Sequence, residues 1–189
     1  MKLWTNQPPE VLDILERDGV YYCEPNKSEN YEELKEAYDW IANEMRKRNI
    51  PNPSNAELPL WAWHTRDWKH KKPDLRLAEY GESGRRYVCI EFEIADDCVL
   101  LSDQEFWHCV LNDAWIDDST NDTEFDEMWD KYEKLSKSEK EDLKIKSWQK
   151  IFNVEPLDTE WETRGRYIQA TFWELRKEMV TGVRYFTAR

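Results

Sequence analysis

The last part of the chain carries the pattern that most limits the possible folds. Within residues 166–175, Ile168, Ala170 and Phe172 alternate with other side chains, which is the two-residue period of a strand whose faces meet different surroundings. A short connector follows, and the alternation resumes over residues 181–186. Two strands alone are only marginally stable in water. The upstream chain must therefore supply a sheet on which they pack.

The upstream residues contain patterns for five more strands, which could form that sheet, and for helices that could pack on it. Alternating runs predict strands at residues 2–6, 20–23, 60–64, 87–94 and 98–101. Apolar side chains at helical spacing predict helices at residues 9–18, 31–47, 103–112, 123–135 and 138–152. Ser102 and Glu105 have the spacing of a capping box, which starts the third helix at Asp103. Because strands and helices do not alternate regularly, we expect one α+β domain over residues 1–189 rather than a doubly wound sheet.

The charge of the chain narrows the choice of partners. With 27 basic and 40 acidic residues, the net charge is -13. Such a field repels nucleic-acid phosphates and anionic lipid, so direct nucleic-acid binding is disfavoured. The same charge would suit a protein partner with a basic groove, as the alternative to a small nucleotide-like ligand. No apolar run approaches the roughly 18 residues of a membrane helix, and we expect a cytoplasmic protein without membrane contact. The four cysteines form no CxxC pair, which favours reduced thiols.

No strong catalytic or metal-binding motif occurs in the sequence. GxGxxG, the Walker loop, GxSxG and HExxH are all missing. The histidines His64, His70 and His108 lack the spacing of zinc ligands, so we expect no metal site. Glu91 and Glu93 share one strand face, where they are either an acid–base pair or a solvated surface.

Aromatic side chains gather beside the one locally basic stretch. Trp61, Trp63 and Trp68 surround His64, and residues 65–86 are rich in Lys and Arg. Aromatic walls with nearby cations are typical of a site for a phosphate-bearing ligand. The same rings also suit a hydrophobic core.

Arg76 lies in the Lys-Pro-Asp-Leu-Arg motif at 72–76, within this basic stretch. The proline fixes the backbone, so the guanidinium could present two parallel donors to a phosphate or carboxylate. An ion pair with Asp74 explains the same pattern equally well.

Several short motifs along the chain resemble those of one known family. They are Trp-Thr-Asn-Gln-Pro at 4–8, Trp-Ala-Trp at 61–63, Lys-Pro-Asp-Leu-Arg at 72–76, Leu-Leu-Ser-Asp at 100–103 with Trp107-His108, and Gln-Ala-Thr-Phe-Trp-Glu at 169–174. Nearly end to end, the chain resembles a bacterial and phage family known as domain of unknown function 3841. That resemblance implies no activity.

The order of the predicted elements also resembles the ADP-ribosyltransferase fold, in particular the toxins that modify DNA bases. The resemblance rests on a strand, a helix ending at Gly19, a second strand, and a closing pair of strands that contains Gln-Ala-Thr. It implies a split β-sheet with flanking helices and a cleft for NAD. The histidine of the first strand falls on Thr5, and the catalytic glutamate falls on Thr171, two residues after Gln169. Both catalytic side chains are thus replaced.

Three hypotheses follow from the sequence. The first is a protein that binds a nucleotide-derived, NAD-like ligand in this cleft; the expected ligand-binding residues are Thr5, Trp63, His64, Arg76, Gln169 and Thr171. The second is an acidic interaction module that inhibits a basic partner, such as a nucleic-acid enzyme, through its surface at residues 123–152. The third is an active ADP-ribosyltransferase that uses an unconventional glutamate, Glu174 or Glu91.

Overall fold

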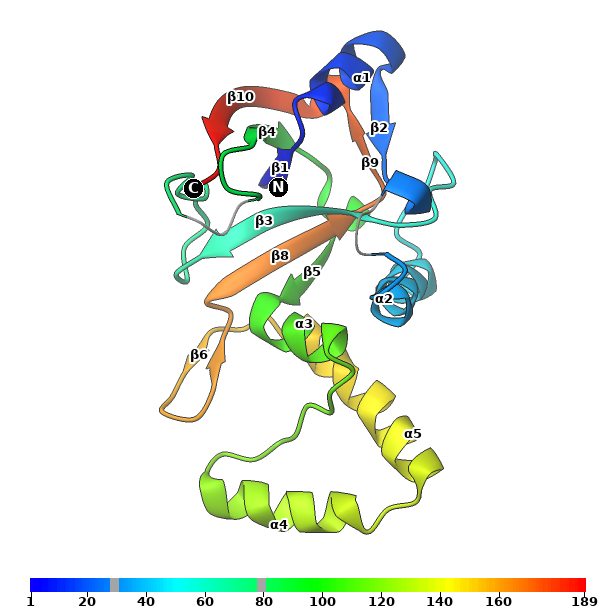
Figure 1. Cartoon of the computed structure of the whole chain (residues 1–189), viewed down its shortest axis with the longest axis vertical. Coiled ribbons are helices and arrows are strands. Elements are labelled where there is room, and N and C mark those ends of the chain that lie inside the picture. The colour runs from blue at the N-terminus through cyan, green and yellow to red at the C-terminus, as the bar shows by residue number, and fades with distance from the viewer. Residues whose placement is uncertain (28–30, 78–80) are drawn as a thin grey trace.

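A computed structural model describes residues 1–27, 31–77 and 81–189, and its centre is a six-stranded antiparallel sheet (Figure 1). The order across the sheet is β10 (Val180–Thr187), β4 (Arg86–Glu93), β1 (Lys2–Gln7), β3 (Leu60–Arg66), β8 (Tyr167–Phe172) and β5 (Leu100–Asp103). A two-stranded sheet of β2 (Val20–Tyr22) and β9 (Glu174–Arg176) continues the chain from β8. The α+β class predicted from the sequence is confirmed.

One face of the large sheet packs under helix α1 (Glu10–Asp18). Alternate residues of the central strands, among them Ile90, Phe92 and Phe172, join α1 residues in one buried cluster. The helix ends at Gly19, whose φ of 75° is the left-handed cap that glycine adopts without strain. The prediction of a strand, a helix ending at Gly19 and a second strand is therefore confirmed.

The opposite face is covered over part of its width by α2 (Lys35–Lys47), α3 (Gln104–Leu111) and the 3₁₀ helix η3 (Trp148–Phe152). Their apolar side chains form a second buried cluster that includes Ile41, Met45, Trp107, Trp148, Ile151 and Trp173. Helix α4 (Asp122–Glu133) stands at the bottom of Figure 1 and joins α5 (Lys137–Ser147), which leads back to the sheet. The helices do not reach this face at β1 and β4, where Trp4 and Cys89 pack against Leu75 of the loop before β4 in a third, smaller cluster.

The two closing strands do not pair with each other. β8 and β10 both form as predicted, but β3, β1 and β4 lie between them in the sheet. β10 pairs with β4, and β8 pairs with β3 and β5. The connector between the two strands includes β9, which leaves the large sheet to pair with β2. The last two strands of the large sheet therefore lie in different parts of it: β10 forms one edge, and β8 lies next to the strand at the other edge.

Several predicted boundaries are corrected. Asp103, not Ser102, caps α3: its carboxylate accepts from the backbone N–H groups of Glu105 and Phe106. Ser102 instead lies fully buried on β5. Helix α2 begins at Lys35 rather than at residue 31, and α5 begins after a capping box that starts at Ser136. The predicted loop at 153–165 contains a short hairpin of β6 (Leu157–Asp158) and β7 (Thr163–Arg164).

Two further observations concern the helices and the cysteines. Among the described residues, every helix is too short or too polar to cross a lipid bilayer. The four cysteines are free thiols.

Candidate functional site

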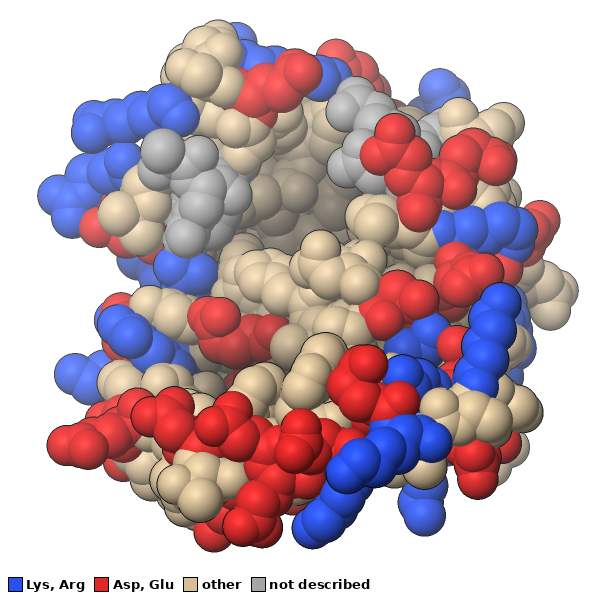
Figure 2. Space-filling model, turned by 60° about the horizontal axis from the view of Figure 1, so that its bottom comes forward, with Lys and Arg blue, Asp and Glu red and all other residues tan. Residues whose placement is uncertain are grey.

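A cavity of about 300 Å³ opens on the sheet face that the helices leave free. Its lining comes from four neighbouring strands and the loop before β4: Asn6, Trp61, Ala62, Trp63, Gly81, Tyr87 and Gln169. We call it the sheet cavity. Its size is at the lower end of small-molecule sites. None of these side chains is charged, and Figure 2 shows a hollow with uncharged visible walls above a band of acidic side chains.

Strand register brings these residues together. Trp63 is the cross-strand partner of both Trp4 and Gln169, and Trp61 is the partner of Thr171. Because side chains alternate between the two faces of a strand, Trp61 and Trp63 share a face two residues apart. Asn6 follows Trp4 on that face by the same rule. Residues from three separate parts of the chain thus converge.

Four polar atoms of the sheet cavity are buried without a hydrogen-bond partner among the described residues. They are Oδ1 and Nδ2 of Asn6, Nε1 of Trp61 and Oε1 of Gln169. Buried polar groups are nearly always hydrogen-bonded, because each one left unpaired costs about 1–3 kcal/mol. Two donors and two acceptors left unpaired in one aromatic cavity are the arrangement that a polar ligand would satisfy.

Packing behind the cavity fixes its aromatic walls. Trp61 lies against Trp107 with ring centres 4.8 Å apart and against Tyr38 at 6.3 Å. The guanidinium of Arg66 lies 4.5 Å from the ring centre of Trp63, close enough for a cation–π contact. A positive charge therefore stands beside an uncharged cavity.

Tyr87 forms the remaining wall under the loop that carries Gly81. A Cβ atom at Gly81 would lie 2.4 Å from the Tyr87 ring, and φ at this glycine is 133°. The Tyr87 hydroxyl accepts from the backbone N–H of Glu82 at 3.2 Å. Only glycine fits this close approach, so the loop and the ring are fixed to each other.

Of the six predicted ligand-binding residues, Trp63 and Gln169 line the sheet cavity. Thr5 lies between Trp4 and Asn6, so its side chain faces the other side of β1, where the hydroxyl donates to the Trp61 carbonyl at 2.7 Å. Thr171 is fully buried and donates to the Leu100 carbonyl at 3.2 Å. The structure does not bring these two threonines into the cavity.

His64 and Arg76 also lie outside the sheet cavity. His64 stacks on His70 with ring centres 4.3 Å apart, and burial, helped by the charge of His70, lowers the pKa of His64. Arg76 is exposed and binds both oxygens of Asp74 at 2.8 and 2.6 Å, which is the ion pair given above as the alternative. Trp68 of the predicted aromatic wall is exposed and has Arg166 over its ring.

Sequence reasoning missed Asn6, Tyr87 and Gly81 as cavity residues. A usable signal existed for Asn6, since it follows Trp4 by two residues on a predicted strand. For Tyr87 and Gly81 no signal existed, because their contact depends on a loop conformation. Within the described ranges, no group of three or more His, Cys, Asp and Glu side chains is placed to hold a metal ion.

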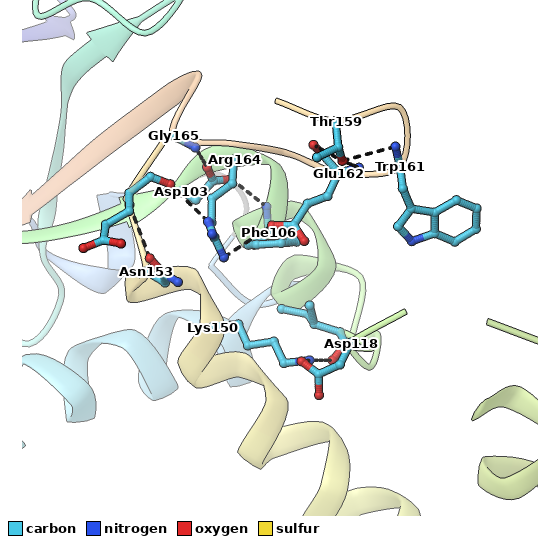
Figure 3. Close-up of polar contacts among 12 residues, drawn as sticks. Asp103, Phe106, Asp118, Lys150, Asn153, Thr159, Trp161, Glu162, Arg164 and Gly165 are labelled. Atoms are coloured by element: carbon cyan, nitrogen blue, oxygen red, sulfur yellow. Dashed lines mark hydrogen bonds and ion pairs between the residues drawn. The ribbon is translucent and has the colours of Figure 1, made fainter. Parts of the chain in front are cut away.

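Asp103 lies at the junction of β5 and α3, away from the sheet cavity, and its carboxylate connects three segments of the chain. Asp103 caps α3 through one oxygen and accepts from the Gly165 N–H at 2.6 Å through the other (Figure 3). Burial raises the pKa of Asp103, against the effect of these backbone donors. This contact ties the β6–β7 hairpin to α3.

Comparison with known proteins places the chain in one family. The family described as domain of unknown function (DUF3841) matches residues 2–181, and the chain belongs to it. No curated protein and no solved structure matches the chain.

Proposed function

We propose that the sheet cavity binds a nucleotide-derived ligand of the NAD type. The observation that carries the proposal is the set of four unpartnered polar atoms on Asn6, Trp61 and Gln169 between aromatic walls. A nicotinamide carboxamide or a nucleobase edge offers donors and acceptors in one plane, which is what amide side chains recognise. Trp63 and Tyr87 would stack on the ring, and Arg66 would favour the ligand's phosphates.

The arrangement of strands supports an ADP-ribosyltransferase-like fold as the origin of this site. β1, α1 and β2 follow in the expected order. The chain then leaves the large sheet at the end of β8 and enters the small sheet as β9, which pairs with β2. The cavity lies beside β1, β3 and β8. The likeness to this fold is an analogy only. The unpartnered polar atoms favour a bound ligand independently of it.

Binding is favoured over ADP-ribosyl transfer by the placement of the carboxylates. Among the described residues, no Asp or Glu lines the sheet cavity. Glu174 is bonded to Ser54 and Arg176, and Glu91 accepts from Lys2 and Trp4. The described residues therefore offer a developing oxocarbenium ion no nearby negative charge to stabilise it.

Calorimetry with NAD, ADP-ribose and nicotinamide tests the proposal. We expect binding of at least one of the three, and a loss of about tenfold in affinity for Trp63→Ala, the size expected for one lost stacking partner. Trp68→Ala is the matched control, since Trp68 lies outside the cavity, and it should bind like the wild type. No heat of binding from any of the three at millimolar concentration contradicts the proposal.

A further inference from the structure

A second site lies away from the sheet cavity, in a groove between α3, α4 and the β6–β7 hairpin. Two adjoining cavities of about 400 and 450 Å³ form it, and they share Phe106, Cys109, Trp161 and Glu162. We call it the aromatic groove. It shares no lining residue with the sheet cavity.

Aromatic rings from four segments form the walls of the aromatic groove. Phe106 comes from α3, Trp115 from the following loop, Phe125 from α4 and Trp161 from the hairpin. The rings of Phe125 and Trp161 lie 6.3 Å apart, and Trp161 is 40% exposed. A large ring that remains this open contributes little to the core, whereas exposed tryptophans often contribute strongly to protein interfaces.

The hairpin turn holds Trp161 in place. The Thr159 hydroxyl accepts from the backbone N–H groups of Trp161 and Glu162 at 3.3 and 2.9 Å (Figure 3). At the base of the hairpin, Asp103 binds the Gly165 N–H. The backbone that carries Trp161 therefore loses little conformational freedom when the ring binds a partner, which favours affinity.

The charges that line the aromatic groove are mostly negative. Glu105, Asp117, Asp122 and Glu162 line it. The side chains of Glu105 and Asp122 have no partner within the described part of the chain. Arg166 also lines one cavity, but its guanidinium lies 3.6 Å from Asp67 and over the Trp68 ring.

The field of these carboxylates reaches the floor of the groove. Burial raises the pKa of the Cys109 thiol, and the charges of Asp117 and Glu105 raise it further. Helix α4, of which Asp122 is the first residue, carries six acidic residues and one lysine, and Figure 2 shows an acidic band along the lower edge of the molecule. Anionic ligands are repelled from this side.

We propose that the aromatic groove binds a basic peptide segment of a partner protein. Arginine or lysine side chains would lie against the Trp161 and Phe125 rings as cation–π contacts, with Glu105 and Asp122 as their counter-charges. The observations that select this occupant are an aromatic wall and two carboxylates, Glu105 and Asp122, without cationic partners among the described residues of the same groove. Glu162, by contrast, already lies 3.4 Å from Arg164. Nucleic acids and anionic membranes are negatively charged, so the carboxylates of the groove would repel them.

The test is calorimetric titration of the whole chain with three synthetic peptides of equal length: alternating Arg-Gly, alternating Lys-Gly and alternating Glu-Gly. We expect the Arg and Lys peptides to bind and the Glu peptide not to bind. Trp161→Ala and Glu105→Gln should each weaken binding by about fivefold or more, the effect of one cation–π or exposed charge contact. Glu160→Gln, which removes the same charge outside the groove, should change the affinity by less than about twofold.

Three outcomes overturn the proposal. The first is no binding of the Arg and Lys peptides at millimolar concentration by a chain whose thermal unfolding is normal. The second is an equal effect of Glu160→Gln and Glu105→Gln, which would indicate general attraction to the acidic surface. The third is a dimer in sedimentation analysis that Trp161→Ala dissociates, which would assign the groove to a second copy of this chain.

Discussion

Gln169 offers the sharpest test of the sheet cavity, because a binding role and a structural role predict opposite changes in stability. Its Oε1 is buried without a partner among the described residues, at a cost of about 1–3 kcal/mol to the ligand-free protein. Gln169→Met keeps nearly the same shape and removes that acceptor. We therefore expect the variant to gain about 1 kcal/mol in free energy of unfolding. For a chain of this length, that gain raises the Tm by about 2–4 °C.

Thermal and urea unfolding followed by circular dichroism measure this change. Gln149→Met is the matched control, because the Gln149 side-chain oxygen accepts from Arg48 at 2.9 Å, and its loss should not stabilise the protein. The Gln169 variant should also lose about tenfold in ligand affinity. A lower Tm for Gln169→Met would refute the reasoning, since it would mean that Gln169 is bonded within the protein, for example to its strand neighbour Ser102.

Three further substitutions test other parts of the structure. Glu91→Gln should lower the free energy of unfolding by about 1 kcal/mol at pH 7. Hydrogen bonds from Lys2 and a tryptophan of β1 lower the pKa of Glu91 from its usual 4.5. Urea unfolding should therefore show the difference in stability between wild type and variant shrinking once the pH falls below 4.5 and vanishing below the lowered pKa. Asp103→Ala removes a helix cap and a hairpin contact and should cost about 2 kcal/mol in the same assay. Gly81→Ala pushes a Cβ into the Tyr87 ring and should weaken NAD binding in calorimetry. Gly84→Ala strains the backbone at another positive φ, of 82°, but its Cβ meets no neighbouring atom, so it should leave NAD binding unchanged.

Local patterns were sufficient to predict most of the strands. The alternation of Val88, Ile90 and Phe92 with polar neighbours reports a face packed against the core, and the structure buries all three completely. Pairing was less accessible, because a two-residue period says which face a side chain takes but not which strand lies beside it. For this reason the sequence did not reveal that β10 joins β4 while β8 lies on the other side of β1.

The site could be predicted only in part. Trp63 and Gln169 stand out by residue type on predicted strands, and they meet in the sheet cavity. Thr5 and Thr171 came from a resemblance of motifs, and both hydroxyls donate to backbone carbonyls instead. Whether a polar atom lacks a partner depends on packing across several strands, which one sequence does not show. The position of Asn6 two residues after Trp4 was readable in the sequence, but only the structure shows that both polar atoms of its side chain lack a partner among the described residues.

The most direct test of ligand binding is NMR of the side-chain N–H groups in the ¹⁵N-labelled chain. The Trp61 indole N–H has no acceptor among the described residues, whereas the Trp148 and Trp173 indoles donate to backbone carbonyls at 2.8 and 3.2 Å. On addition of NAD, the Trp61 indole and the Asn6 carboxamide signals should shift, and the Trp148 and Trp173 signals should stay in place. Unchanged Trp61 and Asn6 signals at millimolar NAD, ADP-ribose and nicotinamide would contradict the proposed site.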